Sequence, residues 1–223
     1  MGAAIGQSLP VAVGVLISPL PIVAVVLMLV SGRAKANASA FLVGWFVAVL
    51  VVVGLVAVLA GSAVPDGEGA PLWAAIVKIV LGLGLLLLAV KQWRGRPREG
   101  VAPETPTWMA AIDQFTPGKA LGLAVLLSAV NPKNLLLVVS GGTAIAAAAP
   151  GDTNAQVVAA VVFAVIASAG VVTPLVIYLA MGERAAAVLD GLKSWMVQNN
   201  AVIMAVLLLV IGAKMIGDGI SAL

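Results

Sequence analysis

The sequence contains no cysteine and no histidine among its 223 residues. Disulfide bonds, thiolate or imidazole metal sites and histidine-based acid–base catalysis are therefore excluded. Redox conduction and transition-metal export also fit the chain poorly, because thiolate and imidazole are the ligands that such metals prefer. We expect no cofactor, no bound metal ion and no catalytic residue.

Charged residues are also scarce, at 9% of the chain, whereas hydrophobic residues make up 62% and the mean hydropathy is +1.18. A water-soluble domain of this size cannot expose so apolar a surface. The sequence therefore predicts an integral membrane protein, surrounded by membrane lipids and without a nucleic-acid partner. The first apolar run is long and has no basic segment before it, which favours a retained span over a cleaved signal peptide.

Several apolar runs are long enough to cross a bilayer, since a spanning helix needs about 20 residues. They lie at about 4–30, 39–63, 71–91, 119–149, 155–181 and 199–217. The sequence thus predicts an all-α protein with six transmembrane helices.

Basic residues cluster in alternate loops. After the first, third and fifth spans stand Arg33, Lys35, Lys91, Arg94, Arg96, Arg98, Arg184 and Lys193. The two loops between them hold only acidic charges, Asp66 and Glu68 in one and Asp152 in the other. By the positive-inside rule, we expect both termini on the outer face of the cell inner membrane.

With three spans in each half, the second half would be inverted relative to the first. Weak sequence echoes agree, since Pro19, Phe46 and Gly54 have counterparts in Pro132, Phe163 and Gly170. We predict two inverted three-helix repeats, residues 1–92 and 119–223, joined by a cytoplasmic linker at 93–118.

Two inner segments have apolar residues at helical spacing. These are Trp108, Ile112 and Phe115 in the first segment, and Leu189, Leu192, Trp195 and Met196 in the second. They fit helices lying on the inner leaflet or, equally, loop helices packed against the bundle.

Two helix-start signals lie in the middle of spans one and four: Ser18-Pro19-Leu20-Pro21 and Asn131-Pro132-Lys133-Asn134. Ser or Asn before Pro is a preferred N-cap and first-turn pair, so each motif predicts a helix that begins inside the membrane. Two such N-termini would form a midplane anion site, whereas the alternative is a simple kink in each helix. The expected substrate-binding residues are Ser18, Pro19, Pro21, Ser128, Asn131, Pro132, Lys133 and Asn134.

Lys133 has no acidic partner within the spans, because all nine acidic residues lie in loops or at span ends. A midplane lysine costs about 2.5–3.5 kcal/mol on insertion scales, which makes it a functional candidate. Three roles are open: it binds a substrate anion, it is held by Ser18, Ser128, Asn131 and Asn134, or desolvation favours its neutral form for proton coupling. Snorkelling to the surface is the structural alternative.

Other polar or small residues within the spans suggest further roles. Lys78 marks an exit path for an anionic group, or snorkels outward. Thr173-Pro174 is expected to break span five, as a hinge or as a static kink. Gly82 and Gly84 permit close helix contact, which makes a homodimer one expected assembly.

Three stretches together resemble a known group. They are Ser18-Pro19-Leu20-Pro21, Trp108-Met109-Ala110-Ala111-Ile112-Asp113 and Leu127-Ser128-Ala129-Val130-Asn131-Pro132-Lys133-Asn134-Leu135. The chain is similar over nearly its whole length to the GAP/Sap family of glycopeptidolipid- and sulfolipid-addressing proteins, in the lysine-exporter (LysE) superfamily. The resemblance implies a six-helix inner-membrane exporter that moves complex glycolipids toward the envelope surface. Ser-Pro-Leu-Pro departs from the Gly-Pro signature of the amino-acid exporters, which weakens an amino-acid substrate.

Several functions follow from these features. The leading hypothesis is alternating-access export or flipping of an anionic (glyco)lipid, with its head group at the half-helix N-termini and Lys133. The alternative is an exporter of a small zwitterion or carboxylate such as an amino acid, with a site sealed by the bundle instead of open to lipid. Two other classes are an intramembrane hydrolase, with Ser128 or Ser140 as nucleophile and Lys133 as base, and a non-transporting envelope scaffold.

Overall fold

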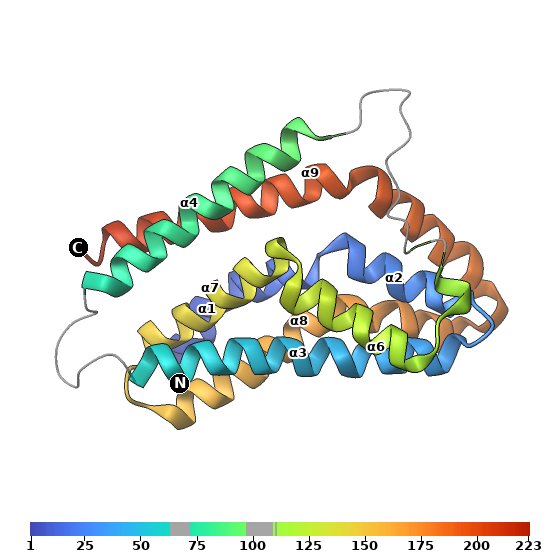
Figure 1. Ribbon diagram of the computed structural model, residues 1–223, viewed down its shortest axis with the longest axis horizontal. Helices are drawn as coiled ribbons and strands as arrows, with labels where there is room; N and C mark the ends of the chain where they lie inside the picture. The colour runs from blue at the N-terminus through green and yellow to red at the C-terminus, as the bar shows by residue number, and fades with distance from the viewer. Residues whose placement is uncertain (63–71, 97–108, 110) are drawn as a thin grey trace.

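The computed structural model describes residues 1–62, 72–96, 109 and 111–223, and within them every regular element is a helix (Figure 1). The elements are α1 (Gly2–Leu16), α2 (Pro19–Leu29), α3 (Ala34–Ser62), α4 (Leu72–Arg94), η1 (Ile112–Gln114), α6 (Pro117–Val125), η2 (Leu126–Val130), α7 (Pro132–Ala148), α8 (Thr153–Met181), η3 (Gly182–Arg184) and α9 (Ala185–Ile220).

Four of these helices, α3, α4, α8 and α9, are long and apolar enough to cross a membrane. Two further spans are bent pairs: α1 and α2 meet at 50°, and the helix that ends with η2 meets α7 at 63°. The chain is therefore a multi-pass helical membrane protein with four to six candidate spans. The predicted breaks in spans one and four are both present.

The helices separate a lipid-facing surface from a packed interior. On α3, large aliphatic side chains recur every four residues on the exposed face, at Val43, Val47, Val51, Leu55 and Leu59. The opposite face buries Phe41 and Trp45, whose rings stack at 6.2 Å, and the Trp45 indole N–H donates to the carbonyl of Ala167 on α8 at 3.4 Å. Residues four apart share one helix face, so this pattern fixes which side of α3 contacts the bundle.

The two broken spans lie among the unbroken helices α3 and α8, whereas α4 and α9 pack along one another at one side of the molecule (Figure 1). Small residues permit the close α4–α9 contact. A methyl group on Gly82 would lie 2.8 Å from the Gly212 carbonyl oxygen, and one on Gly212 would lie 2.9 Å from that of Gly82. Gly82 is therefore used within the chain instead of being free to contact a second copy.

Span five is not broken at Thr173-Pro174, contrary to the sequence prediction, because α8 runs without interruption from Thr153 to Met181. Proline removes one backbone N–H, but membrane helices tolerate this loss when neighbouring groups compensate. The Thr173 hydroxyl donates to the Ala169 carbonyl at 2.8 Å, so this side chain bonds within its own helix. A hinge role for this pair stays a prediction.

The second inner segment is not a separate helix. Residues 189–196 belong to α9, which continues unbroken for 36 residues and begins at Ala185 instead of near residue 199. Leu189 and Met196 are buried against the bundle, so core packing and not the membrane surface holds this part of the helix.

The first inner segment packs against the bundle where the structure describes it. Ile112 is buried, and the Phe115 carbonyl accepts a hydrogen bond from the buried Asn37 side chain at 3.0 Å. Trp108 lies outside the described residues. The described part thus fits the packed alternative and not a helix on the leaflet surface.

Candidate substrate site at the two broken spans

Span one breaks at Ser18. The amide of Ile17 donates to Val13 and that of Ser18 to Val15, after which Ser18 takes an extended conformation (φ −65°, ψ 113°) and α2 begins at Pro19. A residue before proline is restricted to extended backbone, so Pro19 explains this geometry. The Ser18 hydroxyl does not cap α2, as the motif suggests; it donates instead to a side chain of span four.

Span four breaks through a π-turn. The amide of Asn131 donates to the carbonyl of Leu126, five residues back, at 2.8 Å, which closes the wide turn η2. Asn131 is extended (φ −62°, ψ 118°), and its side-chain oxygen accepts from the Lys133 amide at 3.1 Å. This confirms Asn131 as the N-cap of α7. Single π-turns of this kind are frequent at functional sites.

Asn134 joins the two breaks. Its Nδ2 donates to the Leu127 carbonyl at 2.7 Å, and its Oδ1 lies 3.1 Å from the Ser18 hydroxyl. A carbonyl oxygen only accepts hydrogen bonds, so the NH₂ group must face Leu127 and the hydroxyl of Ser18 must donate to Oδ1. Both side chains are buried. One amide group therefore satisfies a carbonyl left free by the π-turn and holds span one against span four.

Lys133 is the second residue of α7 and is half-buried. Within the described residues, its ammonium group makes no hydrogen bond and no ion pair. Beside it, Leu126 is 55% exposed and Val130 58% exposed, and Pro132 is exposed as well. The break in span four is therefore accessible from outside the bundle, whereas Ser18, Pro19 and Pro21 in span one are buried.

The two serines considered as nucleophiles bond to their own helices. The Ser128 hydroxyl donates to the Ala124 carbonyl at 2.8 Å, and the Ser140 hydroxyl donates to that of Leu136 at 2.6 Å. In the part of the chain that the structure describes, neither hydroxyl bonds Lys133. Of the other predicted site residues, Lys78 is half-buried on α4 and Thr173 is exposed on α8, both outside the broken spans.

Gly170 also lies beside the broken spans. The sequence indicates it only as the counterpart of Gly54 in the other half of the chain. A methyl group on Gly170 would overlap the carbonyl oxygen of Leu16, the last residue of α1. The backbone of α8 thus passes directly against the broken end of span one, and only glycine permits this approach. A glycine inside an apolar helix, four residues before Pro174, was the available signal.

Together these observations define a multi-pass helical membrane protein built around two proline-broken spans that are joined by a buried Ser–Asn hydrogen bond. The family model of Sap, the sulfolipid-1-addressing protein, matches residues 9–221. The chain therefore belongs to the Sap family, as the sequence resemblance indicates, and the family name points to a lipid-related addressing role instead of catalysis. Membership of the wider lysine-exporter superfamily stays a prediction. Searches among curated proteins and solved structures found no match.

Proposed function

We propose that this protein exports or flips an anionic (glyco)lipid or related amphiphile across the inner membrane. The head group would bind where the two broken spans meet. The observation that carries the proposal is the Ser18–Asn134 hydrogen bond, which places the beginnings of α2 and α7 side by side with the unpaired Lys133. Discontinuous helices of this kind form the substrate sites of many secondary transporters.

The position of the break supports a site near the bilayer midplane. In span four, 9 residues of α6 and 5 of η2 precede Asn131, and 17 residues of α7 follow it. In span one, 15 residues precede the break and 11 follow it. Since the hydrocarbon core is about 30 Å thick and a helix rises about 1.5 Å per residue, both breaks fall well inside the core.

The positive charge at this site comes mainly from Lys133. Pro19 and Pro21 have no N–H, so Leu20 is the first residue of α2 that offers one to a ligand. In α7 the Lys133 amide is already used by Asn131. Lys133 therefore supplies the full positive charge at the site, and a substrate anion beside its ammonium would offset the about 2.5–3.5 kcal/mol that a midplane lysine costs.

The exposure of the span-four break favours an amphiphile over a small solute. A lipid needs a lateral opening, because its acyl chains stay in the bilayer while its head group occupies the site. Leu126, Val130 and Pro132 beside the break are exposed, so lipid can reach span four at this point, which supports a site that opens laterally. A carrier of amino acids would instead be expected to enclose its site within the bundle.

The helix contacts support alternating access by two inverted repeats, residues 1–92 and 119–223. α3 packs against α6 and α7 in the same way as α8 packs against α1 and α2, and α4 packs against α9. A two-fold axis in the membrane plane that exchanges spans one, two and three with four, five and six maps these pairings onto one another.

The charge distribution supports cytoplasmic placement of one end of the bundle. Arg33, Lys35, Lys119, Arg184 and Lys193 lie where α2 and α8 end and α3, α6 and α9 begin (Figure 1). By the positive-inside rule this end faces the cytoplasm, and both termini then face outward.

Lipid analysis of the gently extracted protein tests the proposal. We expect selective enrichment of an anionic lipid with the wild type and its loss with Lys133→Gln at matched yield. Lys91→Gln is the control, since it removes the same charge from an exposed position at the end of α4. Equal enrichment in all three proteins, or only bulk lipid in the wild type, would contradict the assignment and direct attention to small-solute efflux.

A further inference from the structure

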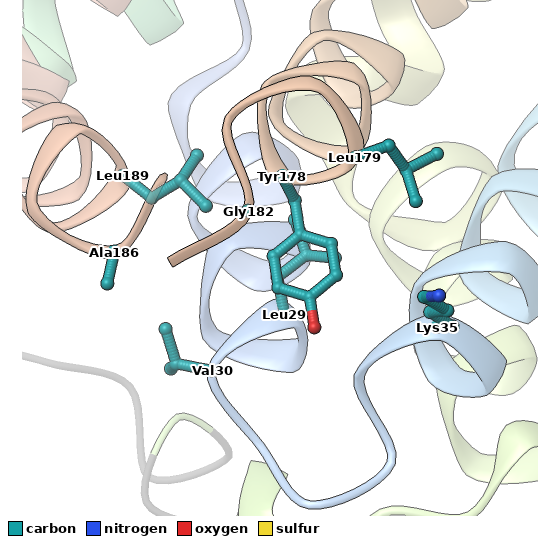
Figure 2. A pocket seen from close by; sticks show the side chains of 8 residues that line it. All are labelled: Leu29, Val30, Lys35, Tyr178, Leu179, Gly182, Ala186 and Leu189. Carbon is teal, nitrogen blue, oxygen red and sulfur yellow. The ribbon is translucent and has the colours of Figure 1, made fainter. Parts of the chain in front are cut away.

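A concave site lies at the basic end of the bundle, away from the breaks in spans one and four. It is a pocket of about 560 Å³ between the ends of α2 and α8 and the beginnings of α3 and α9 (Figure 2). This volume lies within the range of small-molecule binding pockets. Its walls include Leu29, Val30, Lys35, Tyr178, Leu179 and Leu189.

The pocket exists because the chain turns sharply between α8 and α9. Gly182 ends α8 with a φ of +56°, a backbone conformation that residues with a side chain rarely adopt. A methyl group there would meet no atom within 4 Å, so the turn borders open space. The turn directs α9 away from α8 and leaves the volume between them and α2 unfilled.

Two polar groups face this volume. Figure 2 shows the Tyr178 ring reaching from α8 past Leu29, with its hydroxyl directed toward the opening between α2 and α3, where Lys35 lies. Tyr178 is the chain's single tyrosine. Within the described residues, neither the Tyr178 hydroxyl nor the Lys35 ammonium has a hydrogen-bond or ion-pair partner. A cation and a hydroxyl donor that line the same pocket suit an anionic oxygen acid group.

The remaining walls are apolar and differ in exposure. Leu29 and Leu189 form a buried inner wall, whereas Val30 is 58% exposed and Leu179 60% exposed at the rim. Tyrosine and lysine with an apolar stem are typical of the level where lipid head groups meet acyl chains. The pocket thus combines a polar end for a head group with an apolar rim for a chain.

We propose that this pocket binds the anionic head group of an amphiphile, a phosphate, sulfate or carboxylate, at the cytoplasmic leaflet. The inference rests on the proposed lipid transport and adds a loading site to it. α2 connects the two sites, since its end borders the pocket and its beginning forms the span-one break. Its 11 residues span about 16 Å at about 1.5 Å per residue, which is the distance the head group travels along this helix.

Photolabelling in nanodiscs tests the loading site. The probe is a diazirine-bearing phosphatidic acid in phosphatidylcholine, and peptide mapping locates the label. We expect labelling in the segments that carry Lys35 and Tyr178, and a reduction of about threefold to tenfold in Lys35→Gln and in Lys35→Gln with Tyr178→Phe. Arg33→Gln is the matched control, because it removes an equal exposed charge two residues before Lys35 without lining the pocket.

Three results would overturn the loading site: undiminished labelling in the double variant, equal labelling by the corresponding phosphatidylcholine probe, or inorganic phosphate competing as well as unlabelled phosphatidic acid. The last would assign the pocket to free anions.

Failure of the proposed transport function gives a different result from failure of the loading site. Pocket labelling that persists without any movement of the probe between leaflets supports the binding site while it contradicts transport. Normal transport without pocket labelling contradicts the loading site alone.

Discussion

Replacing Asn134 with alanine removes the group that joins the two broken spans. The substitution leaves the Leu127 carbonyl and the Ser18 hydroxyl without the partner they share. A buried polar group left unpaired costs about 1–3 kcal/mol, and Ser18 is able to turn toward a carbonyl of its own helix. One carbonyl then stays unpaired, so we expect Asn134→Ala to lower the free energy of unfolding by about 1–3 kcal/mol, and Ser18→Ala to lower it by about 1 kcal/mol.

A double-mutant cycle isolates the contact between the spans. Measured hydrogen bonds between membrane helices average about 0.6 kcal/mol and reach about 1.7 kcal/mol, so we expect a Ser18–Asn134 coupling energy within that range. Tryptophan fluorescence during unfolding in mixed micelles with sodium dodecyl sulfate supplies the free energies. Ser140→Ala combined with Asn134→Ala is the control, because the Ser140 hydroxyl bonds only the Leu136 carbonyl of its own helix and should show no coupling. A Ser18–Asn134 coupling no larger than this control would refute the bridge.

Three glycine substitutions give further predictions that the same unfolding assay checks. Gly170→Ala should destabilise the protein by about 1–3 kcal/mol, because the methyl group overlaps the Leu16 carbonyl and α8 must shift. Gly191→Ala, with open space around it, should be neutral or stabilising by up to about 1 kcal/mol, and equal effects at both positions would contradict the steric argument. Gly82→Leu should separate α4 from α9, because the Gly212 backbone occupies the space that the new side chain needs. We expect it to destabilise the protein by at least as much as Gly170→Ala. Unchanged stability would contradict a close α4–α9 contact.

The breaks in spans one and four were predictable because their cause is local. Proline lacks an N–H and restricts the residue before it, and Asn131 caps α7 through an amide only two residues away. The partner of Ser18 was not predictable in the same way, since Asn134 lies 116 residues further along the chain. The π-turn before Asn131 also has no sequence pattern of its own, because it depends on which carbonyl the Asn131 amide reaches.

The inner end of the bundle shows the same limit of sequence reasoning. The residues at 189–196 have an amphipathic pattern that fits a surface helix, yet they continue into span six as one helix. Amphipathic spacing shows that one face is covered, but not whether lipid or protein covers it. The loading pocket was also hidden, because Lys35 and Tyr178 belong to different halves of the chain and only folding brings them to one cavity.

Proline alone does not decide where a span breaks in this protein. Pro10 and Pro174 lie inside continuous helices, whereas Pro19 and Pro132 begin new ones. At three of these four positions, the residue before the proline has a side chain that makes a hydrogen bond. The partner of that bond differs between the continuous helix and the two breaks. Before Pro174, the Thr173 hydroxyl donates to a carbonyl of its own helix and so, among the described residues, makes no bond outside it.

Where the structure describes the chain, the side chains before Pro19 and Pro132 do not bond to the helix that precedes the break, and their partners differ. Asn131 accepts from an amide of the helix that follows, whereas Ser18 donates to Asn134 across the interface. Span four thus carries its own cap and would remain broken if the spans moved apart, while the bond of the Ser18 hydroxyl to Asn134 would be lost. In the proposed transport cycle, separation of the two halves would therefore release Ser18 and leave the beginning of α7 intact. Under the proposed function, a head group that reached the Ser18 hydroxyl would compete with Asn134 for it, and binding of the substrate would then be coupled to release of the contact that holds the two spans together.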